Sequence, residues 1–190
     1  MPNAIDMLRQ DHAGMRELLD LFALQVESMR SQEADPDYHL MYQIADFFVR
    51  FADAVHHPCE DRMYDLMRSH GHQLAQVLDG LAEEHLTLGA IGSDLRTRLK
   101  AAHAGQLTSR ERLLESCTGF LQFQIHHMDV EERHLFPAAA QHLTDGELRE
   151  IAEASHRDPN VTESAWLDAR FERIRAALLD EVRGSIARPA

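Results

Sequence analysis

Residues 113–131, LLESCTGFLQFQIHHMDVE, decide the fold of this chain. Side chains recur at steps of three and four residues, the spacing that lines one side of an α-helix. That side begins apolar and ends polar, because its members are Leu113, Cys117, Phe120, Gln124, His127 and Glu131. The pattern predicts a helix that carries a histidine and a glutamate into the interior of a helical protein.

The same spacing recurs over the rest of the chain, where no strand-like alternation lasts. Pro58 and Pro137 are expected to disturb or bend the helices that contain them. Short turns between long helices are typical of an up-down-up-down arrangement. The sequence therefore predicts an all-α, four-helix bundle whose helices cover about 3–30, 38–69, 73–103 and 108–142, the last of them capped by Thr108 with Glu111.

Extra helices are expected after the bundle. Thr144 and Glu147 form a capping-box pattern that opens a short helix. A last helix over about 164–182 carries Trp166 and other apolar residues at helical spacing, so it is expected to pack on the bundle. The chain then divides into a bundle, residues 1–143, and a C-terminal helical extension, residues 144–190.

Composition limits the classes of partner. The 190 residues suffice for one domain, and their net charge of −13 with no cluster of Lys or Arg argues against nucleic acid and anionic membranes. No apolar run approaches the roughly 18 residues that cross a bilayer. Cys59 and Cys117 lie far apart and suit free thiols in a reducing compartment, and the N-terminus has no signal pattern. We therefore expect a cytoplasmic protein.

Four of the 13 histidines are predicted to lie at one depth of the bundle. His12 lies 18 residues before the end of its helix, and His56 lies 18 residues after the start of the next one. Equal counts of residues with a rise of about 1.5 Å each bring both rings to one level below the shared turn. The same counting places His85 and His127 at that level.

Two of these histidines have a glutamate four residues later, Glu60 after His56 and Glu131 after His127. Residues four apart share a helix face, so each pair can bind one metal or bridge two. Buried imidazoles and carboxylates need partners or a metal, and a satisfied polar core is the alternative reading. Six ligands without a thiolate suit two ions bridged by the glutamates, with Fe or Mn favoured over structural Zn.

These motifs resemble a known family. The segments HHPCED (56–61) and HMDVEE (127–132), the LFP that follows at 135–137, and the pairs Asp11-His12 and Glu84-His85 are similar to the hemerythrin-like, or HHE cation-binding, family over about residues 3–143. The resemblance implies a four-helix bundle with an oxo- or hydroxo-bridged pair of Fe ions; Mn or Zn are alternatives. It implies as ligands His12, His56, His85 and His127, with Glu60 and Glu131 as bridges.

The sequence departs from the oxygen-carrying members at Gly89, where they have a second histidine one turn after the ligand that matches His85. They also have an aspartate five residues after the last histidine, where this chain has Glu131 after four. The departures argue against simple reversible oxygen carriage. His57 is a candidate substitute ligand or a structural group.

Four neighbours of these residues keep two interpretations each. Tyr64 is an outer hydrogen-bond donor or part of the core. Cys59 is an oxidation sensor or a buried small hydrophobe. Asp11 and Glu84 orient neighbouring side chains or are solvated.

Three functions fit these observations. The leading hypothesis is a non-haem di-iron protein that binds or reacts with O2, NO or peroxide, in sensing or stress protection. The others are iron storage or delivery, including iron–sulfur cluster repair, and a non-catalytic helical interaction module. No nucleophile–base motif, phosphate-binding loop or dinucleotide fingerprint occurs. Whether the protein is an enzyme is left open by the sequence. A protein partner would be a separate chain that the sequence does not identify.

Overall fold

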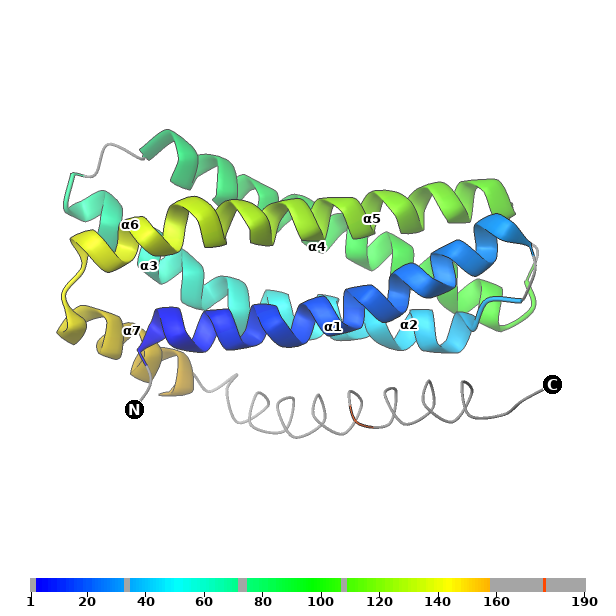
Figure 1. Ribbon diagram of the computed structural model, residues 1–190, viewed down its shortest axis with the longest axis horizontal. Helices are drawn as coiled ribbons and strands as arrows, with labels where there is room; N and C mark the ends of the chain where they lie inside the picture. Colours follow the sequence, from blue (N-terminus) through cyan, green and yellow to red (C-terminus); the bar gives the residue numbers. More distant parts are fainter. Residues whose placement is uncertain (1–2, 33–34, 72–74, 107–108, 158–175, 177–190) are drawn as a thin grey trace.

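The computed structural model describes residues 3–32, 35–71, 75–106, 109–157 and 176. Every regular element in these residues is helical. Four helical arms run side by side and alternate in direction, because short connections join each arm to the next (Figure 1). The predicted all-α four-helix bundle is confirmed.

The second and fourth arms are each built of three consecutive segments, whereas the first and third are single helices. The first arm is α1 (Ala4–Ser31) and the third is α4 (Ala75–His103). The second arm comprises α2 (Tyr38–Phe47), the π-helix η1 (Phe48–His56) and α3 (His57–Ser69). The fourth comprises α5 (Arg110–Val130), the π-helix η2 (Glu131–Leu135) and α6 (Phe136–His142).

Side-chain caps fix where three of the arms begin. The side chains of Asn3, Asp37 and Ser109 each accept a hydrogen bond from the backbone N–H three residues later, at 3.0, 2.9 and 3.4 Å. These bonds satisfy backbone donors that have no partner inside the helix. Thr108, the cap expected for the fourth arm, lies outside the described residues, and its neighbour Ser109 has that role.

The two prolines coincide with changes of helix type. Pro58 and Pro137 each lie in the first turn of the α-helix that follows a π-helix. Proline lacks an N–H and its ring clashes with the carbonyl four residues earlier, so a wider turn before it relieves the conflict. The backbone N–H groups of His57 and Phe136 accordingly donate to carbonyls five residues back. The disturbance expected at each proline is this widening.

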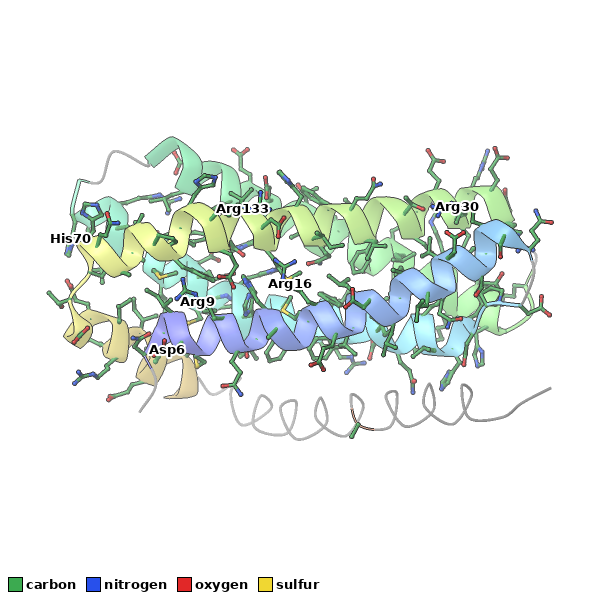
Figure 2. The ribbon with its side chains drawn as sticks, in the orientation of Figure 1. Asp6, Arg9, Arg16, Arg30, His70 and Arg133 are labelled. Carbon is green, nitrogen blue, oxygen red and sulfur yellow. The ribbon has the colours of Figure 1, made fainter. Side chains whose placement is uncertain are left out.

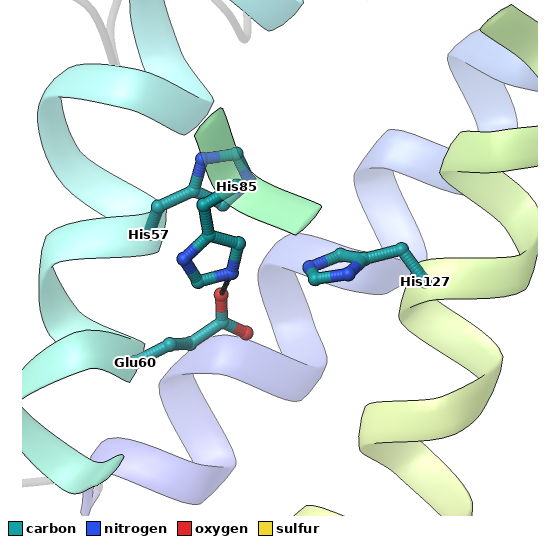
Figure 3. Close-up of side chains that lie close together, drawn as sticks. All are labelled: His57, Glu60, His85 and His127. Atoms are coloured by element: carbon teal, nitrogen blue, oxygen red, sulfur yellow. Dashed lines mark ion pairs between the residues drawn. The ribbon is translucent and has the colours of Figure 1, made fainter. Parts of the chain in front are cut away.

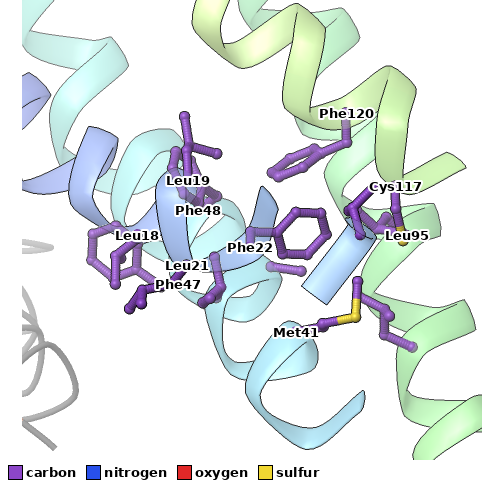
Figure 4. Close-up of a cluster of buried hydrophobic side chains, with 14 of the residues drawn as sticks. Leu18, Leu19, Leu21, Phe22, Met41, Phe47, Phe48, Leu95, Cys117 and Phe120 are labelled. Carbon is purple, nitrogen blue, oxygen red and sulfur yellow. The ribbon is translucent and has the colours of Figure 1, made fainter. Parts of the chain in front are cut away.

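The interior consists of two hydrophobic clusters, one toward each end of the bundle. Figure 4 shows part of the first cluster, where Phe22 and Phe48 each pack edge to face with Phe120, at ring separations of 5.7 and 5.5 Å. The second cluster surrounds the start of α1 and the end of the second and fourth arms, and includes Leu8 and Phe136. Histidines and glutamates separate the two clusters along every arm.

One further helix, α7 (Asp145–Arg157), covers the end of the bundle at which α1 begins (Figure 1). Its predicted capping box is present, since Thr144 N donates to Glu147 Oε2 at 2.8 Å and Glu147 N donates to Thr144 Oγ1 at 3.3 Å. Leu148 and Ile151 bury this helix against the second cluster. The helix expected over 164–182 falls almost wholly outside the described residues. No helix in the described part is long and apolar enough to cross a membrane.

Candidate metal centre

The six residues predicted as metal ligands lie together in a buried layer between the two hydrophobic clusters. They come from all four arms, and each is at most 7% exposed: His12, His56, Glu60, His85, His127 and Glu131. The predicted convergence at one depth is therefore present as geometry. Ordinary solvation cannot satisfy these polar groups, so they must satisfy one another or hold a cation.

The histidines of the first two arms meet directly. His12 Nε2 lies 3.0 Å from His56 Nε2. Two nitrogens that bind the same ion at about 2.0–2.1 Å come this close to each other when they occupy neighbouring positions around it. The contact indicates a shared site for His12 and His56.

The carboxylate of Glu60 presents one oxygen to each side of the layer. Its Oε1 lies 3.2 Å from His56 Nε2 and 3.6 Å from His12 Nε2, and its Oε2 lies 3.4 Å from His85 Nε2. A carboxylate with its two oxygens facing separate groups of imidazoles has the arrangement of a bridge between two ions.

The two carboxylate oxygens of Glu131 also face different histidines. Its Oε2 lies 3.4 Å from His12 Nε2, whereas its Oε1 lies 3.3 Å from His127 Nε2 and 3.8 Å from His85 Nε2. The buried hydroxyl of Tyr64 donates to Glu131 Oε1 at 2.5 Å. Tyr64 is thus a hydrogen-bond donor to this carboxylate, which is one of the two interpretations that the sequence left open for it.

Two overlapping sets of side chains offer ligand atoms within 4.8 Å of one another. One set comprises His12, His56, Glu60 and Glu131; the other comprises His57, Glu60, His85 and His127 (Figure 3). Glu60 belongs to both sets. His57, for which a structural role remained open, lies inside the second set.

Each of the four predicted histidine ligands also has a carboxylate on its outward nitrogen. The Nδ1 atoms contact the following groups: Glu132 at 3.2 Å for His12, Asp11 at 3.1 Å for His56, Asp61 at 3.0 Å for His85 and Glu84 at 2.8 Å for His127. A carboxylate on one nitrogen fixes the ring and its tautomer, and makes the other nitrogen a better ligand.

These four carboxylates form a closed circuit around the bundle. Each is the sequence neighbour of a predicted ligand on one arm and contacts a histidine on the next. Asp11 and Glu84 therefore orient neighbours rather than being merely solvated, and Asp61 and Glu132 join them. Their visible signal in the sequence was an acidic residue directly beside a ligand.

Several buried donor atoms of the layer are left for a cation. Both oxygens of Glu60, Oε2 of Glu131 and Nε2 of His127 are buried without a hydrogen-bond partner among the described residues. Imidazole nitrogens approach several of them at 3.2–3.6 Å without hydrogen-bond geometry. Leaving such atoms unpaired is costly. Imidazole nitrogens and carboxylate oxygens that converge in this way fit two cations.

Without metal, protons must neutralise the layer. Burial disfavours a charged His56, but Glu60 and Asp11 raise its pKa to about 10. Burial acts likewise on His85, whose pKa Asp61, Glu131 and Glu60 raise to about 11. The pKa values of Glu60 and Glu131 are lowered despite burial, because histidines surround both carboxylates. A metal that enters the layer has to displace these protons.

Two arginines of the first arm, Arg9 and Arg16, contact carboxylates of the fourth arm outside the layer, and Figure 2 labels both of them together with Arg133. Arg9 Nε donates to Glu132 at 3.3 Å, and thus holds the carboxylate that faces His12. Arg16 donates to Asp129 at 2.8 Å, and Arg133, on the same arm as Asp129, donates to it at 2.7 Å. The contacts of Arg9 and Arg16 hold the first and fourth arms together near the layer.

Cys59 lies beside Glu60 in the sequence, but its thiol is not in a reactive form. Its side chain is 1% exposed, and burial raises the pKa of its thiol to about 12. Because the thiolate is the reactive form, the structure favours the buried small hydrophobe over the oxidation sensor.

A family model for the hemerythrin HHE cation-binding domain matches residues 3–139 of the chain. The match spans all four arms and every residue of the layer. No curated protein and no solved structure gives a significant match.

Proposed function

Because the chain belongs to the hemerythrin HHE cation-binding family, we propose that it is a non-haem di-iron protein that binds or reacts with O2, NO or peroxide, in sensing or stress protection. The observation that carries the proposal concerns the two oxygens of Glu60 and of Glu131. In each carboxylate one oxygen faces the first group of histidines and the other oxygen faces the second group. One ion with a single ligand sphere does not explain two carboxylates split in this way.

Iron is proposed from the donor types. Imidazole and carboxylate without thiolate suit Fe or Mn, and the six residues together offer more ligands than one structural Zn site uses. A bound iron pair supplies redox chemistry and a coordination position for a small molecule. His12 and His56 would hold one ion, His85 and His127 the other, with Glu60 and Glu131 shared.

The rest of the chain prepares this layer. The hydrophobic clusters on both sides exclude water, which strengthens every electrostatic contact between them. The outer carboxylates turn the Nε2 atoms inward, and Tyr64 keeps a proton on its oxygen at Glu131, since burial and the nearby carboxylates raise its pKa. The buried free thiols Cys59 and Cys117 support a cytoplasmic location.

Elemental analysis and the visible spectrum of aerobically purified protein test the proposal. We expect two irons per chain and an iron-dependent absorption that changes on addition of NO, peroxide or O2. A His56→Ala, His127→Ala double variant should lose both. The matched control is His126→Ala, which removes an exposed histidine next to His127 and should keep both. Protein without bound iron, or a double variant with full iron content, would refute the proposal.

A further inference from the structure

The first two arms bury a wider surface than the other two along the first hydrophobic cluster. An α-helix turns by about 100° per residue, so two consecutive buried side chains face different directions. Such pairs recur on the first two arms, and four of them, with every member at most 6% exposed, are Leu18 with Leu19, Leu21 with Phe22, Phe47 with Phe48, and Phe51 with Ala52. Along the same cluster α4 and α5 bury single residues at steps of three and four, which are Gly92, Leu95 and Leu99 on α4 and Leu113, Cys117 and Phe120 on α5.

Two of these pairs show which member belongs to the interior shared by the four arms. Phe22 and Phe48 both pack against Phe120 of α5. Leu21 and Phe47, one residue earlier, therefore point to another side of their helices, although they are only 6% and 5% exposed. We call this other side the second face; with the residues one turn away it comprises Leu18, Leu21, Phe47 and Phe51.

Burial of the second face requires a cover. In Figure 1, α4 and α5 lie on one side of α1 and α2, and the only helix on the other side, within the described residues, is α7 at the end where α1 begins. Leu18 lies 14 residues after Ala4, the first residue of α1, which is about 21 Å along the helix. Another segment therefore has to cover the second face beyond α7.

The chain itself supplies a segment of the right length and character. Thirty-three residues follow Arg157, where α7 ends beside the start of α1. Residues 158–163 can extend over about 20 Å, which is the distance along α1 to Leu18. A helix over 164–182 would be about 28 Å long, and it would carry Trp166, Phe171, Ile174 and Leu178 at near-helical spacing.

Ala176 indicates which side of such a helix would face the bundle. It is the only described residue after Arg157, and it is helical and exposed. Residues two positions away on a helix are turned by about 200°, so Ile174 and Leu178 would point to the side opposite Ala176. The exposed side and the apolar side of the pattern are thus different sides.

Charges flanking the second face complement those of the segment. Glu17 and Asp20 are exposed on α1 beside Leu18 and Leu21. Three arginines surround the apolar residues in the middle of the segment: Arg170, Arg173 and Arg175. Opposite charges at the rim of an apolar contact favour one partner and one register.

We propose that residues 164–182 form a fifth helix that lies on the second face, with Phe171, Ile174 and Leu178 against it. The tether to α7 holds the segment at an effective concentration of roughly millimolar, which favours it over a second copy of the chain. Within the second face, Phe51 stacks on Phe47 at 5.0 Å and lies 6.2 Å from the ring of His56. The fifth helix therefore closes the hydrophobic wall beside the buried layer on the side of the first two arms.

Fluorescence of the full chain tests this proposal, because Trp166 is its only tryptophan. We expect emission at short wavelength and weak quenching by acrylamide, both independent of protein concentration. Ile174→Asp and Phe47→Ala should each shift the emission to longer wavelength and strengthen the quenching. Ala176→Asp is the matched control, because it places the same charge on the exposed side of the segment and should leave both unchanged.

Three results would overturn the proposal. The first is solvent-exposed emission from Trp166 in the unaltered protein. The second is equal emission and quenching in Ile174→Asp and Ala176→Asp. The third is a short-wavelength emission that is lost on dilution, because a second copy would then cover the second face. If Phe47→Ala does not fold, Ile174→Asp decides, since its substitution lies outside the four arms.

Discussion

The Nε2 atoms of His12 and His56 lie 3.0 Å apart, while the Nδ1 atom of each ring faces a carboxylate of Glu132 or Asp11. A neutral imidazole that donates from Nδ1 carries its lone pair on Nε2, so the two lone pairs would face each other. A proton or a metal cation has to lie between them. The layer therefore binds protons and metal in competition.

This competition makes the stability of the metal-free protein depend on pH. The folded-state pKa of His56, about 10, is raised above the ordinary histidine value of 6.5, and the pKa values of His12, His85 and His127 are raised too. Their contribution to stability is complete below the unfolded value and is lost as the pH rises through the folded values. We expect the Tm of metal-free protein to fall between pH 7 and 10.

Thermal melts of metal-free and iron-loaded protein across that range measure the effect. The loaded protein is the control, because metal takes the place of the protons and its Tm should change less. A metal-free Tm that stays constant from pH 7 to 10 would contradict a protonated layer.

Metal removal should lower the stability at neutral pH. A ligand that binds only the folded chain stabilises it by about 4 kcal/mol at a free concentration of roughly 1,000 Kd. For a domain of this size that corresponds to a Tm change of roughly 10 °C. Calorimetry before and after chelation measures it. An unchanged Tm would favour the alternative in which the polar layer only fixes the register of the bundle.

The helices and the depth of the layer were predictable because both depend on local counting. Steps of three and four residues locate each buried face, and equal distances from a turn bring His12 and His56 to one level. The wider turns were not predictable. Pro58 and Pro137 signal a disturbance, but only the packed backbone decides that it becomes a π-helix, and with it that both His56 and His57 point inward.

The outer carboxylates show a second limit of sequence reasoning. An acidic residue directly beside a ligand, such as Asp11 or Glu84, is visible in the sequence, but the histidine that it contacts lies on another arm. Which histidine it contacts depends on how each helix is rotated about its axis, and packing of the whole bundle determines that rotation. The roles of the six predicted ligands remain predictions that metal analysis decides.

Glu84 should strengthen metal binding through His127, whose Nδ1 lies 2.8 Å from its carboxylate. Loss of such an outer partner typically weakens metal binding by about 10- to 100-fold. We expect Glu84→Ala to show this loss in competition with a chelator of known affinity, and Glu84→Gln to recover part of it. Glu83→Ala is the matched control, because Glu83 is the exposed preceding residue. Equal affinities for Glu83→Ala and Glu84→Ala would show that the contact is unimportant for binding.

Gly92 should be required for the close approach of the second and third arms beside the layer. A Cβ at this position would lie 3.0 Å from Val49 Cγ2 and 3.6 Å from Phe120 Cε2. Val49 is β-branched and stiff, so the contact is hard to relieve, and overpacking costs about 1–3 kcal/mol.

Gly80→Ala on the same helix is the control, because a Cβ at this position would meet no atom within 4 Å. This substitution should stabilise the fold by about 0.5–1 kcal/mol. Urea unfolding of the metal-free variants measures the difference. If Gly92→Ala were as stable as Gly80→Ala, the arms would have room to move apart, and close packing there would not be what holds the layer in place.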